Sequence, residues 1–90
     1  MEVLLLTQAH CGLCAHAERV LERLAGDYPL QVTTLALASP QGRVLAQRGG
    51  ILFPPGVFLD GEPFSYGRLS ERRLRRELQR RQPPVGDDRP

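Results

Sequence analysis

Two cysteines, Cys11 and Cys14, lie three positions apart, with Gly12 and Leu13 between them. Thiols at this spacing can alternate between a dithiol and a disulfide, and they can also hold a soft metal ion such as copper(I). They are the only cysteines among the 90 residues. A bond that closes so short a loop restricts the unfolded chain very little, so we interpret the pair as reactive rather than as a structural staple.

The segments on either side of the cysteines predict a strand followed directly by a helix. Residues 2–7 form an apolar run of strand length, and apolar residues recur at helical spacing across residues 12–25. Cys11 would then lie at the helix N-terminus, where free N–H groups and the helix dipole stabilise a thiolate and lower its pKa. We therefore predict that Cys11 is the nucleophile and that Cys14, one turn further along the same face, is the resolving thiol.

Residues next to the pair are candidates for contact with a substrate. Gly12 allows a substrate to approach the backbone closely, and Leu13 gives the site a neutral rim. Histidine is the residue type that changes charge near neutral pH, so His10 is a candidate to stabilise the thiolate or to carry a proton. His16 falls on the outer face of the predicted helix, where we expect it to be exposed.

After the first helix, the sequence predicts a second strand, a second helix and then a hairpin. Residues 30–37 are apolar and β-branched, which favours a second, buried strand. Ser39 and Pro40 favour a helix start, and that helix should run to about residue 48. Strands at 56–59 and 62–66 should pair antiparallel across a tight turn.

A last helix is predicted from a cap at Ser70 to about Arg81, with Leu74 and Leu78 as its apolar stripe. The order is β-α-β-α-β-β-α, which predicts an α/β fold with a parallel first pair of strands and an antiparallel half. We expect one domain over residues 1–81. The prolines and charges of residues 82–90 have little to bury and predict a disordered tail.

Three features together resemble the glutaredoxin and thioredoxin-like redoxin family over about residues 2–80. They are the Cys-Gly-Leu-Cys motif after the first strand, the segment 53–61 (FPPGVFLDG), and Gly67 ahead of the last helix. The resemblance implies a thioredoxin-like fold, in which three helices flank a four-stranded mixed sheet, and a thiol-disulfide oxidoreductase activity. It also implies a cis-proline at Pro55, which would open the third strand beside the cysteines and shape a groove for the substrate.

The chain departs from that family at the positions that would hold glutathione. Gln8 stands where glutaredoxins usually carry a lysine, and Pro54 has no N–H to offer a substrate. Arg68 is the remaining candidate to bind a carboxylate. His10 stands where thioredoxins usually have a tryptophan. We therefore predict no cofactor and no bound metal, with glutathione left open only as a co-substrate.

Composition and charge indicate where the protein is expected to act and on what partners. The net charge is +2, 41% of residues are hydrophobic, and no apolar run is long enough for a membrane span or a secretory signal. Six arginines lie between residues 72 and 81, but without interleaved aromatics they predict a solvated face rather than a nucleic-acid site. We expect a cytoplasmic monomer that acts on a disulfide-containing protein and receives electrons from a reductase or a low-molecular-weight thiol.

Two functions from other classes stay open on the residues alone. The Cys11/Cys14 pair could bind or transfer copper or zinc, with histidines as further ligands. Alternatively, the chain could be a redox-inert module that binds a protein through its arginine-rich helix.

Overall fold

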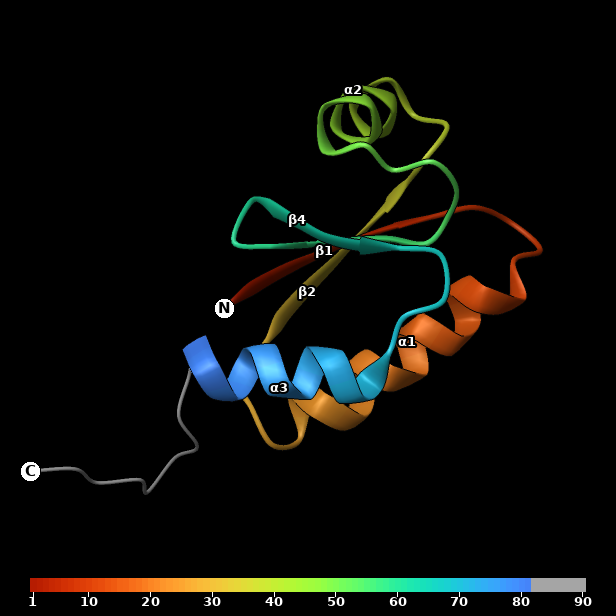
Figure 1. Cartoon of the computed structure of the whole chain (residues 1–90). Helices are drawn as coiled ribbons and strands as arrows, with labels where there is room; N and C mark the ends of the chain where they lie inside the picture. The colour runs from red at the N-terminus through yellow and green to blue at the C-terminus, as the bar shows by residue number, and fades with distance from the viewer. Residues whose placement is uncertain (82–90) are drawn as a thin grey trace, which may run out of the picture.

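The computed structural model describes residues 1–81, which form four strands and three helices around one sheet (Figure 1). In chain order the elements are β1 (Glu2–Thr7), α1 (Gly12–Ala25), β2 (Gln31–Ala36), α2 (Pro40–Gly49), β3 (Gly56–Leu59), β4 (Glu62–Tyr66) and α3 (Glu71–Arg81). This order confirms the predicted β-α-β-α-β-β-α arrangement. The tail predicted for residues 82–90 lies outside the described residues.

The sheet has the strand order β2-β1-β3-β4, with β1 and β3 in its centre. β2 runs parallel to β1, and Leu5 pairs with Thr34 across that boundary. β3 runs antiparallel to β1, with Leu5 opposite Val57, and β4 then returns antiparallel beside β3. The predicted hairpin turn is present at Asp60 and Gly61, whose φ angles are 48° and 85°. The mixed sheet is therefore the one predicted.

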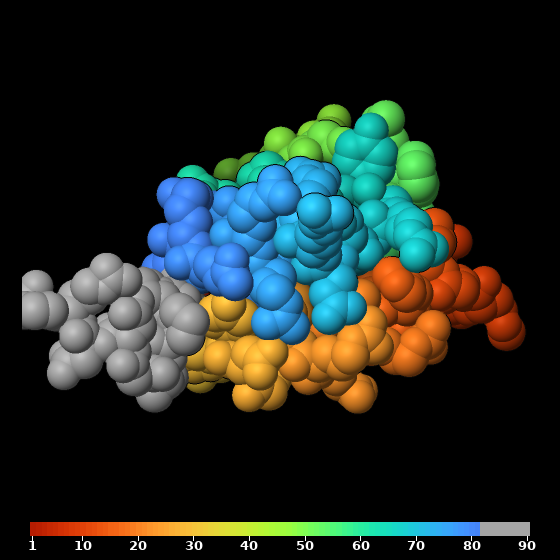
Figure 2. All heavy atoms as spheres, turned by 60° about the horizontal axis from the view of Figure 1, so that its bottom comes forward, coloured from red at the N-terminus to blue at the C-terminus, as the bar shows by residue number. Residues whose placement is uncertain are grey.

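Side-chain alternation divides the core into two layers, one on each face of the sheet. Val3 and Leu5 of β1 point to the face covered by α1 and α3, whereas Leu6 points to the face covered by α2. Figure 1 shows α1 and α3 together on one side and α2 alone on the other, and Figure 2 shows α3 beside α1. The predicted stripe of α3, Leu74 and Leu78, is fully buried in the larger layer.

The prediction that the second strand is buried is wrong, because β2 is largely exposed. All of its residues are exposed except Leu35, and the side chain of Val32 is 43% accessible. The reason is topological: β2 lies at the edge of the sheet, with a neighbouring strand on one side only. A run of β-branched residues suits an edge strand as well as a central one, so its composition could not distinguish the two.

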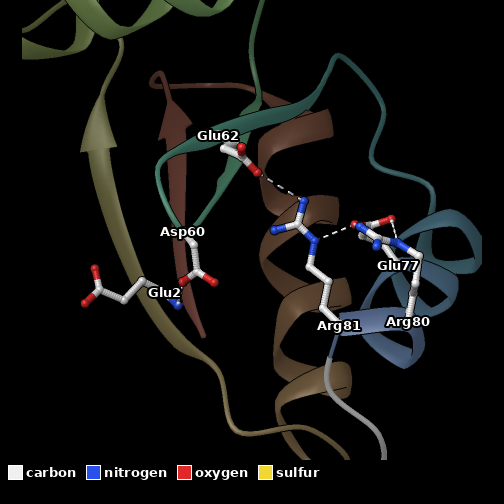
Figure 3. Close-up of polar contacts among 6 residues, drawn as sticks. All are labelled: Glu2, Asp60, Glu62, Glu77, Arg80 and Arg81. Atoms are coloured by element: carbon white, nitrogen blue, oxygen red, sulfur yellow. Dashed lines mark hydrogen bonds and ion pairs between the residues drawn. The ribbon is translucent and has the colours of Figure 1, made fainter.

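Polar contacts close the end of the sheet remote from the cysteines. The carboxylate of Asp60 accepts the backbone N–H of Glu2 at 2.9 Å. Arg81, in the last turn of α3, reaches Glu62 of β4 at 3.5 Å and also pairs with Glu77 (Figure 3). These contacts tie the hairpin to β1 and to the end of α3.

The apolar segments of the chain are all short relative to a bilayer. Within residues 1–81, no helix has the length and apolar character needed to cross a membrane.

Candidate active site

Cys11 caps the N-terminus of α1. Its backbone is extended (φ −117°, ψ 105°), and its Sγ accepts the backbone N–H of Cys14 at 3.1 Å. A sulfur in this position faces the free N–H groups of the first helical turn and the positive end of the helix dipole. Negative charge on Cys11 Sγ is therefore stabilised, as the strand-to-helix spacing predicted.

The two cysteines are joined in a disulfide, with their Cα atoms 5.2 Å apart. They differ in accessibility: Cys14 is buried at 4% exposure, whereas Cys11 is only half-buried. Cys11 is therefore the more accessible residue of the pair. The two cysteines can form a disulfide, so the pair has the geometry for a dithiol-disulfide cycle.

The predicted neighbours of the pair all lie at the surface. His10 is exposed and has a φ of 55°, so the chain turns sharply just before Cys11. Leu13 is 37% exposed and Gly12 is exposed. A Cβ on Gly12 would meet no atom within 4 Å, so nothing in the domain itself requires a glycine there. The predicted use of Gly12 in substrate approach stays a prediction.

The peptide bond between Pro54 and Pro55 is cis, which confirms the isomer that the family resemblance implied. Pro55 is buried and immediately precedes β3. Its carbonyl accepts the N–H of Gly67 at 2.9 Å, so the segment before β3 is fastened to the loop before α3. That loop also carries Arg68, which is exposed and forms no ion pair within residues 1–81.

Phe53 and Tyr66 form an aromatic contact that the sequence patterns did not predict. Their rings meet edge to face at a centroid distance of 5.2 Å, and both remain partly exposed. Gly67 is needed for this contact, because a Cβ there would lie 2.7 Å from the Phe53 ring, and its φ is 75°. The only sequence signal was Gly67 itself, since a glycine before a helix often marks a close approach or a positive φ.

The prediction that His16 is exposed is wrong, because the residue is half-buried. Its Nδ1 is buried and has no hydrogen-bond partner in the described structure. The start of α3 lies close by. There Glu71 accepts a hydrogen bond from Arg23 of α1 at 2.7 Å, and this bond is the main cause that lowers the pKa of Glu71. The charges of Arg75 and His16 act on that pKa in the same direction. Helical spacing alone could not reveal that α3 begins over this part of α1.

Two other features of the described residues concern the surroundings of the cysteines, namely clusters of metal-binding side chains and hollows. Within residues 1–81, no three His, Cys, Asp or Glu side chains gather closely enough to hold a metal ion. A hollow of about 420 Å³ beside β4 is lined by residues of β4 and its neighbours and not by either cysteine.

Comparison with solved structures confirms a thioredoxin-like fold. A point mutant of a thioredoxin from Halobacterium salinarum NRC-1 superposes with a TM-score of 0.65 at 24% identity, and the match covers 88% of this chain and 72% of that one. Oxidised thioredoxin O2 from Arabidopsis thaliana gives the same TM-score and coverage at 19% identity. No family model and no curated protein sequence matches the chain.

The chain thus has a thioredoxin-like fold with a disulfide-bonded Cys-x-x-Cys pair at the start of its first helix. The fold agrees with the predicted class, and the resemblance to thioredoxin-like redoxins is confirmed at the level of the fold. At 19% and 24% identity, the comparison leaves the reaction and the substrate to be argued from the site.

Proposed function

We propose that the protein is a thiol-disulfide oxidoreductase that reduces protein disulfides or mixed disulfides. One observation carries this proposal: Cys11, a half-buried residue, caps α1 with its Sγ and is bonded to the buried Cys14. This arrangement gives one sulfur the electrostatic environment of a nucleophile and keeps the other within reach but out of contact with the substrate.

The first step is attack by the Cys11 thiolate on one sulfur of the substrate disulfide. A bond forms between Cys11 Sγ and that sulfur, the substrate S–S bond breaks, and the other substrate sulfur leaves as a thiolate that takes a proton from solvent. The N–H of Cys14, which lies 3.1 Å from Cys11 Sγ in the oxidised protein, supports the thiolate before attack. We assign to His10, which is next in the chain and exposed, the supply or uptake of a proton.

The second step releases the product. Cys14, deprotonated by solvent or by a nearby base, attacks Cys11 Sγ, and the second substrate sulfur leaves as a thiolate. The substrate gains two electrons and two protons in all, and the protein is left with the Cys11–Cys14 disulfide, the form that the structure holds. A reductase or a low-molecular-weight thiol then returns two electrons to the pair.

An open, apolar surface favours a protein as the substrate. Leu13 beside the pair, together with Phe53 and Tyr66 on the segments around Pro55, presents partly exposed apolar side chains. We assign Pro55 and Pro54 to the floor of the substrate groove and Arg68 to the recognition of a carboxylate. Because Pro54 cannot donate a backbone hydrogen bond, the proposal treats glutathione as an alternative electron donor and not as a bound cofactor.

The same proposal places the protein in a reducing cytoplasm, where a pair of this kind is returned to the dithiol. The proposal assigns the activity to a monomer; one domain contains both Cys11 and Cys14, so the reaction needs no second copy of the chain.

Substitution of each cysteine tests the two roles separately. With dithiothreitol as electron donor and insulin as a disulfide substrate, Cys11→Ser should reduce insulin no faster than dithiothreitol alone, because the remaining thiol, Cys14, is buried. With insulin and no added thiol, reduced Cys14→Ser should instead accumulate a mixed disulfide between Cys11 and the substrate, visible by mass spectrometry and reversed by excess dithiothreitol. Full turnover by either variant would contradict the assigned roles.

Two further outcomes identify the other functional classes. Stoichiometric copper(I) binding with no reversible disulfide in a glutathione redox buffer would favour metal carriage. Cysteines that resist both reduction and oxidation would indicate a redox-inert binding module.

A further inference from the structure

The outer edge of β2 has backbone hydrogen-bonding groups that the sheet does not use. Gln31 donates its N–H to Met1 and Leu37 donates to Thr7, so the odd-numbered residues of this segment face β1. Successive residues alternate direction in a strand, so the N–H groups of Val32, Thr34 and Ala36 point away from the sheet. Figure 3 shows β2 beside β1 on the side away from the β3–β4 hairpin, consistent with its edge position.

Nothing in the sequence of β2 blocks this edge. Natural edge strands are commonly protected by lysine, proline, a bulge or an inward-pointing charge. β2 reads Gln-Val-Thr-Thr-Leu-Ala, with no charge and no proline, and it pairs with β1 in unbroken register over six residues. The edge is therefore regular and able to accept another strand.

An apolar groove runs beside this edge, between β2 and α1. It has a volume of about 400 Å³, and its floor is formed by Leu21 and Ala25 of α1 and by Val32 of β2. The remaining lining residues, Glu18 and Glu22, are both exposed. The groove thus combines an apolar floor with an acidic rim.

The acidic rim has no cationic partner of its own. Glu18 and Glu22 are one helical turn apart, where like charges repel, and neither forms an ion pair with any residue between 1 and 81. The neighbouring Arg23 is already bonded to Glu71. Basic residues two positions apart in an extended peptide are separated by about 6.6 Å, which is close to the spacing of Glu18 and Glu22, one helical turn apart on α1.

We propose that the β2 edge and the α1 groove bind an extended basic segment of a partner protein by strand addition. The segment would pair its backbone with Val32 and Thr34, because the carbonyl of Ala36 already accepts the N–H and the hydroxyl of Ser39. It would place apolar side chains over Leu21 and direct arginine or lysine toward Glu18 and Glu22. The main chain would supply affinity, and the acidic rim would select basic partners.

A second copy of this chain fits the surface less well. Two copies that paired antiparallel through β2 would place both α1 helices on the same face of the joined sheet. The glutamate rims would then approach each other as like charges, which disfavours the contact. A basic segment removes that repulsion.

This surface is separate from the cysteine pair. Leu21 lies ten residues beyond Cys11 in α1, which is about 15 Å along the helix axis. A partner bound at β2 would leave Cys11 accessible, so the proposal holds whether or not the proposed reductase activity does.

The test uses the oxidised protein, labelled with ¹⁵N, and a capped seven-residue peptide of alternating valine and arginine. Amide shifts should concentrate at Val32 and Thr34 and along the groove side of α1, and the amides of Val32 and Thr34 should gain protection from hydrogen exchange. A matched peptide with glutamate in place of arginine should bind much more weakly. A basic peptide that is N-methylated at alternate amides should also bind much more weakly, because it lacks the N–H groups needed to pair with β2.

Glutamine substitutions test the rim without disturbing the core. The double variant Glu18→Gln/Glu22→Gln should weaken the basic peptide about five-fold, as expected for two exposed ion pairs. The control Glu2→Gln, an exposed carboxylate outside the groove, should leave the affinity unchanged.

Several results would overturn the proposal. They are equal binding of the N-methylated peptide, equal binding by the double variant, shifts centred on Cys11 rather than β2, and no binding at about 1 mM peptide. Dimerisation through β2 in the absence of peptide would assign the edge to a second copy instead.

Discussion

Gly67 joins the aromatic contact to the segment that carries Pro55, so its replacement by alanine tests how that part of the site is built. Two costs follow from the structure. The φ of 75° is unfavourable for a residue with a Cβ by about 1 kcal/mol. The new Cβ would also lie 2.7 Å from the Phe53 ring, which must move and so lose its edge-to-face contact with Tyr66, worth about 1 kcal/mol.

The two costs together predict that Gly67→Ala lowers the free energy of unfolding by about 2 kcal/mol. For a domain of this size, each kcal/mol corresponds to a change of about 4–8 °C in Tm, so the melting temperature should fall by about 8–16 °C. Thermal unfolding followed by circular dichroism measures this change. The N–H of residue 67 donates to the Pro55 carbonyl, so a backbone shift that relieves the strain at residue 67 should also slow disulfide reduction.

Gly61→Ala is a matched control, because Gly61 also has a positive φ, 85°, but a Cβ there would meet no atom within 4 Å. It should lose only the conformational part, about 1 kcal/mol. Adding Phe53→Ala to Gly67→Ala should recover part of the loss by removing the clash. Equal destabilisation by Gly67→Ala and Gly61→Ala, with no coupling to Phe53, would refute this account.

Three further predictions concern α3 and the rim of the site. Hydrogen bonds from Arg80 and Arg81 lower the pKa of Glu77 to about 2, so the contribution of Glu77 to stability is present above pH 4.5 and is lost as the pH falls toward 2. Glu77→Gln should therefore reduce the loss of stability between pH 4.5 and pH 2, and an unchanged pH dependence in that range would contradict this prediction. Ser70 Oγ accepts an N–H in the first turn of α3, so Ser70→Ala should cost about 1 kcal/mol in urea unfolding, whereas Ser70→Asp should retain the cap; equal losses would exclude the capping role. Leu13→Ser should slow reduction of a protein disulfide more than that of a small disulfide, and equal effects on both would remove Leu13 from the contact surface.

Local interactions explain what the sequence determined by itself. The helix at Gly12–Ala25 followed from apolar residues repeating with its period, and the hairpin at residues 56–66 followed from a turn dipeptide between two short runs. Cys11 could be placed at a helix start because only its immediate neighbours decide that position. The cis bond at Pro55 came from the family resemblance and not from any local rule.

Contacts between distant segments explain what only the tertiary structure decided. β2 lies at an exposed edge because no strand pairs with its far side, which the β-branched composition of residues 31–36 does not encode. His16 is half-buried because α3 begins over its turn of α1, although Glu71 is 55 positions further along the chain. The Phe53–Tyr66 contact likewise joins the loop before β3 to the end of β4. Periodicity and capping act within a few residues, whereas burial and pairing depend on which segments meet, and that is settled only when the whole chain packs.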